Sequence, residues 1–139
     1  MNLYSAEIRS QQPTGDRTDM LSFLRPDRGA ARIALDEAVR RAGDGTLVVI
    51  DVREAGEVAM TGKARGALHV PLGLVRLRCD PNAPDCPAGL GRDRAVALYC
   101  ASGGRSQMAA QMLRDLGYAE VYNIGGLGDW ISAGGAVER

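Results

Sequence analysis

One cysteine in this sequence stands between an apolar run and a glycine turn. Cys100 ends the run AVALYC and is followed by Ala-Ser-Gly-Gly-Arg-Ser. Apolar residues then recur at helical spacing from position 109 to position 116, so the turn leads from a strand into a helix. A thiol at this place lies near backbone N–H groups that have no partner inside the helix. Such groups stabilise an anion, which is the form in which a thiol acts as a nucleophile.

The turn after Cys100 has the composition of an anion-binding loop. Gly103 and Gly104 lack a Cβ, so the backbone can curl and direct its amides toward the sulfur. The positive end of the helix dipole lowers the pKa of the thiol below its free value of about 8.5. We therefore expect the sulfur, or a negatively charged adduct on it, to be held by Ala101, Ser102, Gly103, Gly104, Arg105 and Ser106.

The alternative to a nucleophile is a buried structural cysteine. Cysteines at strand ends often serve as small apolar side chains. An inert cysteine needs no cradle of amides, so the Gly-Gly-Arg-Ser sequence favours the nucleophile without excluding the structural role.

The rest of the pattern predicts the elements that position this turn. Predicted helices cover 30–42, 54–61 and the stretch after Gly104, with a short helix or turn from Trp130 to Ala133. Predicted strands cover 46–51, 67–71, 95–100 and 120–124, and a long loop covers 76–94. Strands that alternate with helices imply an α/β fold with a mainly parallel sheet, in which the active site forms at the carboxyl ends of the strands. Asp51 and Cys100 both stand at such ends.

The length and composition of the chain argue against several classes of protein. The 139 residues suit one domain, with residues 1–30 as a polar N-terminal extension and residues 31–139 as the folded part. The formal net charge is zero, which argues against a nucleic-acid partner. No apolar stretch approaches the roughly 20 residues of a membrane span, and the N-terminus lacks the apolar core of a signal peptide. We therefore expect a cytoplasmic protein without a membrane partner.

Four separate stretches resemble the successive signature motifs of single-domain rhodaneses, a family of sulfurtransferases. In chain order they are VVIDVREAGEV (48–58), GALHVPLG (66–73), LYCASGGRS (98–106) and NIGGLGDW (123–130). Their order and spacing also match, and the resemblance covers about residues 32–137. It implies a rhodanese domain over residues 31–139, with a central, mainly parallel five-stranded sheet flanked by helices on both faces. It also implies that Cys100 is the nucleophile, in the loop before a helix.

The resemblance implies sulfur transfer at Cys100 with no metal and no organic cofactor. Cys100 takes sulfane sulfur from a small donor such as thiosulfate, becomes a persulfide, and passes the sulfur to cyanide, a small thiol or a protein thiol. One alternative is a regulatory or interaction module that keeps the fold without turnover, although inactive versions usually lose the cysteine. The other is a phosphatase or arsenate reductase of the same fold. Those enzymes have five residues between Cys and Arg, where this chain has four between Cys100 and Arg105.

Arg53 and His69 are two further candidates. Arg53 follows the strand that ends at Asp51, and it either pairs with an acid to fix the loop or adds positive potential near the persulfide. We favour the first role and keep Arg53 among the substrate-binding candidates for the second. His69 is the only histidine, but the reaction needs no general base because sulfite leaves as an anion. Lys63 and Arg65 either place two cations at the mouth of the site or lie in a solvated loop.

Cys79 and Cys86 flank a proline-rich loop, with six residues between them. A zinc site would need further ligands and the chain has one histidine, so we expect no metal there. Free thiols are the simplest interpretation, with a loop disulfide or a sulfur-accepting role beside Cys100 as alternatives. The sequence does not decide the physiological donor and acceptor, the oligomeric state or the role of residues 1–30.

Overall fold

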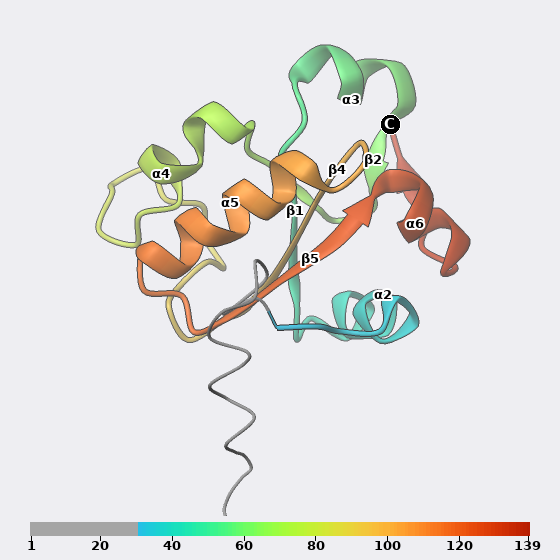
Figure 1. The fold of residues 1–139 in the computed structure, drawn as a ribbon. Coiled ribbons are helices and arrows are strands. Elements are labelled where there is room, and N and C mark those ends of the chain that lie inside the picture. Colours follow the sequence, from blue (N-terminus) through green and yellow to red (C-terminus); the bar gives the residue numbers. More distant parts are fainter. Residues whose placement is uncertain (1–30) are drawn as a thin grey trace, which may run out of the picture. The chain divides into compact units, whose positions relative to one another are not determined.

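The computed structural model describes residues 31–139, and the extension predicted for residues 1–30 lies outside the described part. The central sheet has four parallel strands in the order β3-β1-β4-β5 (Figure 1). Their bounds are β1 (Val48–Asp51), β3 (Leu68–His69), β4 (Ala95–Cys100) and β5 (Glu120–Gly126). Helices alternate with these strands along the chain, which confirms the predicted α/β class with a parallel sheet.

Within the described residues, this sheet has one strand fewer than the family resemblance implies. At the outer edge of β5, Ala31 forms a single parallel bridge with Tyr122. Helix α2 (Leu35–Asp44) begins four residues further on, so little chain follows the bridge to extend the pairing. A second, antiparallel sheet joins β2 (Lys63–Ala64) to β6 (Val137–Glu138), and the sequence pattern predicts neither of these strands.

Different helices cover the two faces of the central sheet. Helices α5 (Gly104–Asp115) and α4 (Val75–Arg78), the latter preceded by the 3-10 turn η3 (Leu72–Leu74), cover one face, and α2 and α6 (Leu127–Ser132) cover the other. Successive side chains of a strand point to opposite faces. Leu98 and Cys100 therefore join the core beneath α5, whereas Ala97 and Tyr99 join the core beneath α2 and α6. Because both faces are covered, the run AVALYC is buried along its whole length.

The long loop predicted over 76–94 is shorter in the structure. Helix α4 takes up Val75–Arg78, and hydrogen-bonded turns follow it. The predicted short helix at 54–61 is α3 (Ala55–Thr61), which begins with a capping box between Glu54 and Glu57. None of the helices in residues 31–139 has the length and apolar character required to cross a membrane.

The strand register brings the carboxyl ends of β1 and β4 to the same edge of the sheet. Asp51 pairs with Tyr99, and Cys100 is the next residue along β4. Three residues then lead from Cys100 into the first turn of α5, and α3 follows β1 on the same side (Figure 1). The first turn of α5, the end of β5 and helix α3 therefore surround the thiol.

Candidate active site

The sulfur of Cys100 lies in a cradle of backbone amides. The N–H of Gly103 donates to Cys100 Sγ at 3.0 Å, and the backbone N–H groups of Ser102 and Ser106 also donate to this sulfur. Gly103 is the N-cap of α5 and offers no side-chain cap, so the amides of the first helical turn face the sulfur instead. The structure thus brings the predicted loop around the predicted nucleophile.

The ionisation of Cys100 is decided by two opposing effects. Burial raises the pKa of the thiol, and the Cys100 residue is only 1% exposed. Hydrogen bonds from the Ser106 hydroxyl and from the three backbone amides outweigh burial and lower the pKa to about 7. A thiol with this pKa is about half ionised at neutral pH. The neighbouring residues Ala101 and Ser102 are exposed, so the thiolate lies beneath an accessible loop.

Only one of the two adjacent glycines in the loop is required by its geometry. Gly103 has φ 105°, a conformation that residues with a Cβ rarely adopt. Gly104 has no positive φ, and a Cβ on it would meet nothing within 4 Å. A third glycine matters as well, because a Cβ on Gly126 would lie 2.1 Å from the carbonyl oxygen of Ala101. The close approach of β5 to the loop therefore depends on Gly126, and the expected role of Gly104 in curling the turn is not needed.

Ser106 and Asn123 hold the loop from below. The Ser106 side chain is fully buried, and its hydroxyl has one proton for three acceptors. These acceptors are Asn123 Oδ1 at 2.7 Å, the Gly103 carbonyl oxygen at 3.1 Å and Cys100 Sγ at 3.5 Å. Asn123 Nδ2 also donates to the Gly103 carbonyl oxygen at 3.0 Å. Asn123 therefore fixes both the N-cap residue and the hydroxyl that faces the sulfur.

The guanidinium of Arg105 is held by a residue that the sequence did not single out. Arg105 Nη1 and Nη2 donate to Glu57 Oε1 and Oε2 at 2.7 and 2.9 Å. Glu57 Oε1 also accepts the backbone N–H of Glu54 at 2.9 Å, which completes the capping box of α3. The Arg105 hydrogen bond, followed by that of the Glu54 backbone, lowers the pKa of Glu57 to about 2. The sequence places Glu57 in the first turn of the helix predicted over 54–61, but it does not indicate that Arg105 is its partner.

Arg53 lies in a buried network next to the site. Its guanidinium donates to the Asp51 carboxylate, with the closest contact at 2.7 Å, and to the Gly62 carbonyl oxygen at 2.7 Å. Tyr99 Oη donates to the same carboxylate at 2.6 Å, and His69 Nε2 lies 2.7 Å from the Arg53 carbonyl oxygen. This network supports the role in which Arg53 fixes the loop after β1. Contact between Arg53 and a substrate stays a prediction.

The other cysteines are not brought to Cys100. Tyr118 Oη donates to the Cys79 carbonyl oxygen at 2.6 Å, and Tyr118 lies just beyond the last turn of α5. Cys100 lies at the first turn of the same helix, whose 12 residues span about 18 Å. This separation disfavours a sulfur-accepting role for Cys79, which is a free thiol, as is Cys86.

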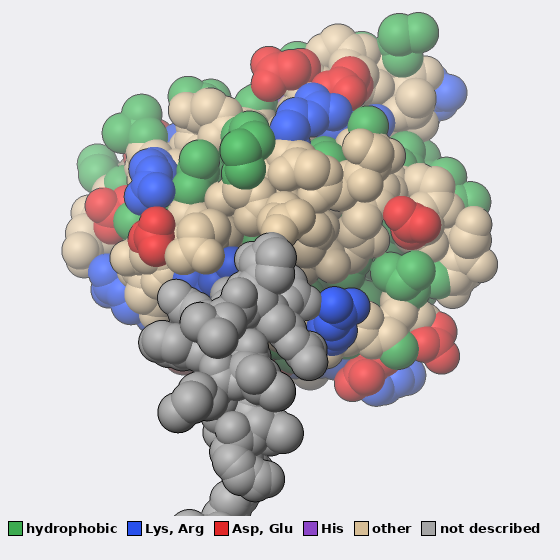
Figure 2. All heavy atoms as spheres, viewed as in Figure 1, with side chains coloured by type: hydrophobic (Ala, Val, Ile, Leu, Met, Phe, Trp, Pro, Cys, Tyr) green, Lys and Arg blue, Asp and Glu red, His purple; other side chains and the backbone are tan. Residues whose placement is uncertain are grey.

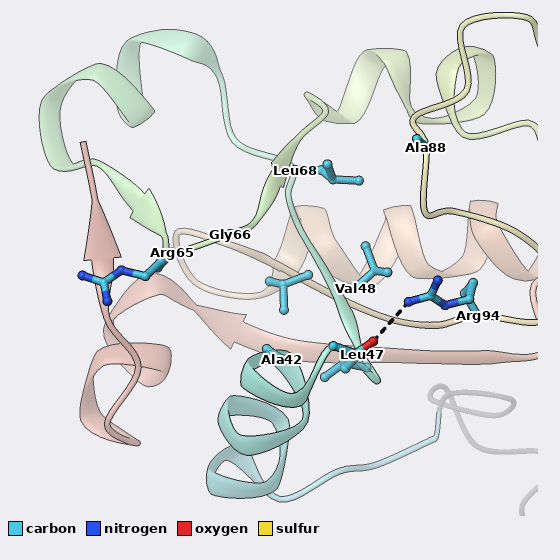
Figure 3. A pocket seen from close by; sticks show the side chains of 10 residues that line it. Ala42, Leu47, Val48, Arg65, Gly66, Leu68, Ala88 and Arg94 are labelled. Carbon is cyan, nitrogen blue, oxygen red and sulfur yellow. Dashed lines mark hydrogen bonds between the residues drawn. The ribbon is translucent and has the colours of Figure 1, made fainter.

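Lys63 and Arg65 do not form the pair of cations at the mouth of the site that the sequence offered as one alternative. Lys63 forms an ion pair with Glu138 of β6. Arg65 lines a pocket of about 270 Å³ with Val48 and Arg94, whose guanidinium donates to the Gly45 carbonyl oxygen at 3.2 Å (Figure 3). Val48 begins β1, so this pocket lies at the opposite end of the sheet from Cys100.

The fold and the loop define a class of protein: a parallel α/β domain with a cysteine of lowered pKa at the end of a central strand. The family model of the rhodanese-like domain matches residues 34–133. The chain therefore belongs to the rhodanese-like domain family, and this confirms the resemblance seen in the sequence.

Similar proteins include two named sulfurtransferases. A sulfurtransferase from Allochromatium vinosum is 32% identical over 96 residues, which cover 68% of this chain and 81% of that protein. The thiosulfate sulfurtransferase PspE of Escherichia coli is 35% identical over 80 residues, which cover 58% of this chain and 70% of that protein. A solved structure from Rhodopseudomonas palustris, described as a protein of unknown function and possible tyrosine phosphatase, is 27% identical with a TM-score of 0.71. That similarity covers 94% of this chain and 99% of the other.

Proposed function

We propose that this protein is a sulfurtransferase that carries sulfane sulfur on Cys100. The observation that supports this most is the ring of amides from Ser102, Gly103 and Ser106 around a thiol with a pKa of about 7. A persulfide anion needs the same donors as a thiolate, so one cradle serves both halves of the reaction. The named sulfurtransferases among the relatives agree with this proposal.

The proposed reaction needs no acid or base. The Cys100 thiolate attacks the outer sulfur of thiosulfate, the sulfur–sulfur bond of the donor breaks, and sulfite leaves with the bonding electron pair. Cys100 then carries a persulfide anion. Cyanide or a thiolate attacks its outer sulfur, takes that atom away as thiocyanate or a new persulfide, and restores the Cys100 thiolate. A structural role for His69 is consistent with this scheme.

The four-residue spacing between Cys100 and Arg105 favours sulfur over a tetrahedral oxyanion. Three amides already converge on the one sulfur atom, so the loop suits a single atom better than the four oxygens of a phosphate. The phosphatase or arsenate reductase alternative predicts turnover of an aryl phosphate or arsenate, and the non-catalytic module predicts neither activity. A cytoplasmic location and a protein thiol acceptor also stay predictions.

Mass spectrometry of the intact protein tests the proposal. After incubation with thiosulfate, the wild type should gain the mass of one sulfur atom and lose it again on treatment with cyanide. Cys100→Ser should gain nothing. If the variant still gains the sulfur, the carrier is Cys79 or Cys86. Hydrolysis of an aryl phosphate without any sulfur loading would replace the proposal with the phosphatase alternative.

A further inference from the structure

The ion pair between Arg105 and Glu57 occupies the one cation that adjoins the amide cradle in the described loop. Both outer nitrogens of the guanidinium end on the two oxygens of the Glu57 carboxylate. The side chains are 31% and 36% exposed, so water and small anions reach the pair. Water screens a partly exposed ion pair, so a second anion can compete with Glu57 for the guanidinium. An incoming sulfonate must therefore displace Glu57 or share Arg105 with it.

Glu57 also offsets the charge that Arg105 exerts on the thiolate. The pKa of Arg105 is raised first by its hydrogen bond to Glu57, and an interaction with Cys100 raises it further, which places the guanidinium within reach of the sulfur. The Glu57 carboxylate, with a pKa of about 2, is charged at every working pH. On the face shown in Figure 2, acidic and basic side chains are interspersed, so no extended field of one sign outweighs this local pair.

We propose that Glu57 determines donor specificity by competing with the anionic group of the donor for Arg105. The inference rests on the proposed sulfurtransferase function. The Glu57 carboxylate repels a donor more strongly the more negative charge the donor carries. Glu57 therefore disfavours thiosulfate, which carries two charges, relative to an alkanethiosulfonate, which carries one. Both donors deliver their outer sulfur to the Cys100 thiolate by the same step, with sulfite or an alkanesulfinate as the leaving group.

Two matched variants separate this charge effect from the structural role of Glu57. Glu57→Gln keeps the size of the side chain and the capping box, because glutamine at this helical position also accepts the N–H of the N-cap residue. Glu54→Gln removes a charge from the same helical turn while keeping an oxygen for the cap. Glu54 takes part in the capping box, whereas Arg105 pairs with Glu57, so this second variant controls for a general change in surface charge.

The first measurement is the ratio of kcat/KM for thiosulfate to that for methanethiosulfonate. We expect Glu57→Gln to raise the ratio about three- to tenfold, mainly through a lower KM for thiosulfate, as expected for the loss of one nearby charge. Glu54→Gln should leave the ratio near that of the wild type. An unchanged ratio in Glu57→Gln, or an equal change in both variants, overturns the inference.

The second measurement does not depend on sulfur transfer. Alkylation of Cys100 by iodoacetamide, followed on its peptide, is measured against increasing inorganic sulfate. Glu57→Gln should need several-fold less sulfate to halve the alkylation rate, and Glu54→Gln should match the wild type. If no variant loads sulfur, the proposed function fails and the sulfate protection alone decides whether Glu57 competes for anions at Arg105. Equal protection in all three proteins contradicts the inference.

Discussion

Cys79 and Cys100 are both buried in the same core, yet the structure makes them opposite kinds of thiol. Cys79 is 0% exposed and Cys100 is 1% exposed. Burial, with a smaller contribution from Cys86, raises the pKa of Cys79 to about 11. The pKa of Cys100 falls to about 7 because amides and a hydroxyl donate to its sulfur. Burial alone makes a thiol inert, whereas burial among donors makes it a nucleophile.

The secondary structure around each sulfur explains the difference. Cys79 directly follows α4 as its C-cap, where carbonyl groups rather than amides are left without helical partners. Its own N–H donates to Val75, and its carbonyl accepts from Tyr118, so both hydrogen bonds are made by the backbone. Cys100 precedes the N-terminus of α5, where amides are unpaired. At neutral pH the thiol at the C-terminus of α4 is therefore protonated, whereas the thiol before the N-terminus of α5 is about half ionised.

Substitution of Cys100 should give the largest effect on activity, and substitution of Cys79 should affect stability instead. Cys100→Ser should lower sulfur transfer at least about a thousandfold, because the atom that carries the sulfur is lost. Cys79→Ala should keep the activity while lowering the free energy of unfolding by about 1–2 kcal/mol, because it leaves a small cavity in the core. Thiocyanate formation and urea unfolding measure the two effects. Loss of activity in Cys79→Ala at unchanged stability would break the distinction between the two sites.

The two adjacent glycines sharpen the comparison, because only one of them shapes the cradle. Gly103→Ala forces a side chain into φ 105°, which strains the loop by roughly 1–2 kcal/mol. The N–H that faces the sulfur then moves, and we expect about tenfold to a hundredfold slower transfer. Gly104→Ala has open space and should be neutral or slightly stabilising. Steady-state kinetics and thermal unfolding of both variants test this, and equal losses of activity would contradict it.

Ser106→Ala should have the smallest effect. The variant removes one donor to the sulfur and leaves the amides, so the pKa of Cys100 should rise and the midpoint of the pH–rate profile should move to higher pH. In the variant, Asn123 Oδ1 still accepts a hydrogen bond from the N–H of Gly125, so the loop should stay in place. A midpoint that stays where it is, or moves down, would show that the Ser106 proton is held by Asn123 rather than shared with the sulfur.

Local features of the site could be predicted from the sequence, and contacts across the fold could not. Cys100, the glycine turn and the amides before α5 are neighbours in the chain, so strand, turn and helix patterns were sufficient to place them. Glu57 and Asn123 reach the loop only because α3 and β5 pack beside it. The pairing of β2 with β6 joins segments more than 70 residues apart, and two-residue strands carry no alternating pattern to reveal them.

The pH dependence of alkylation at both buried cysteines tests the central claim most directly. The rate at each sulfur follows its thiolate fraction, so it rises with pH through the pKa of that thiol. We predict that alkylation of Cys100 rises with a midpoint near pH 7, while Cys79 stays unreactive until near pH 11 in the folded protein. If the two cysteines titrate together, or if Cys100 reacts only well above its free value of about 8.5, the amide cradle does not activate Cys100.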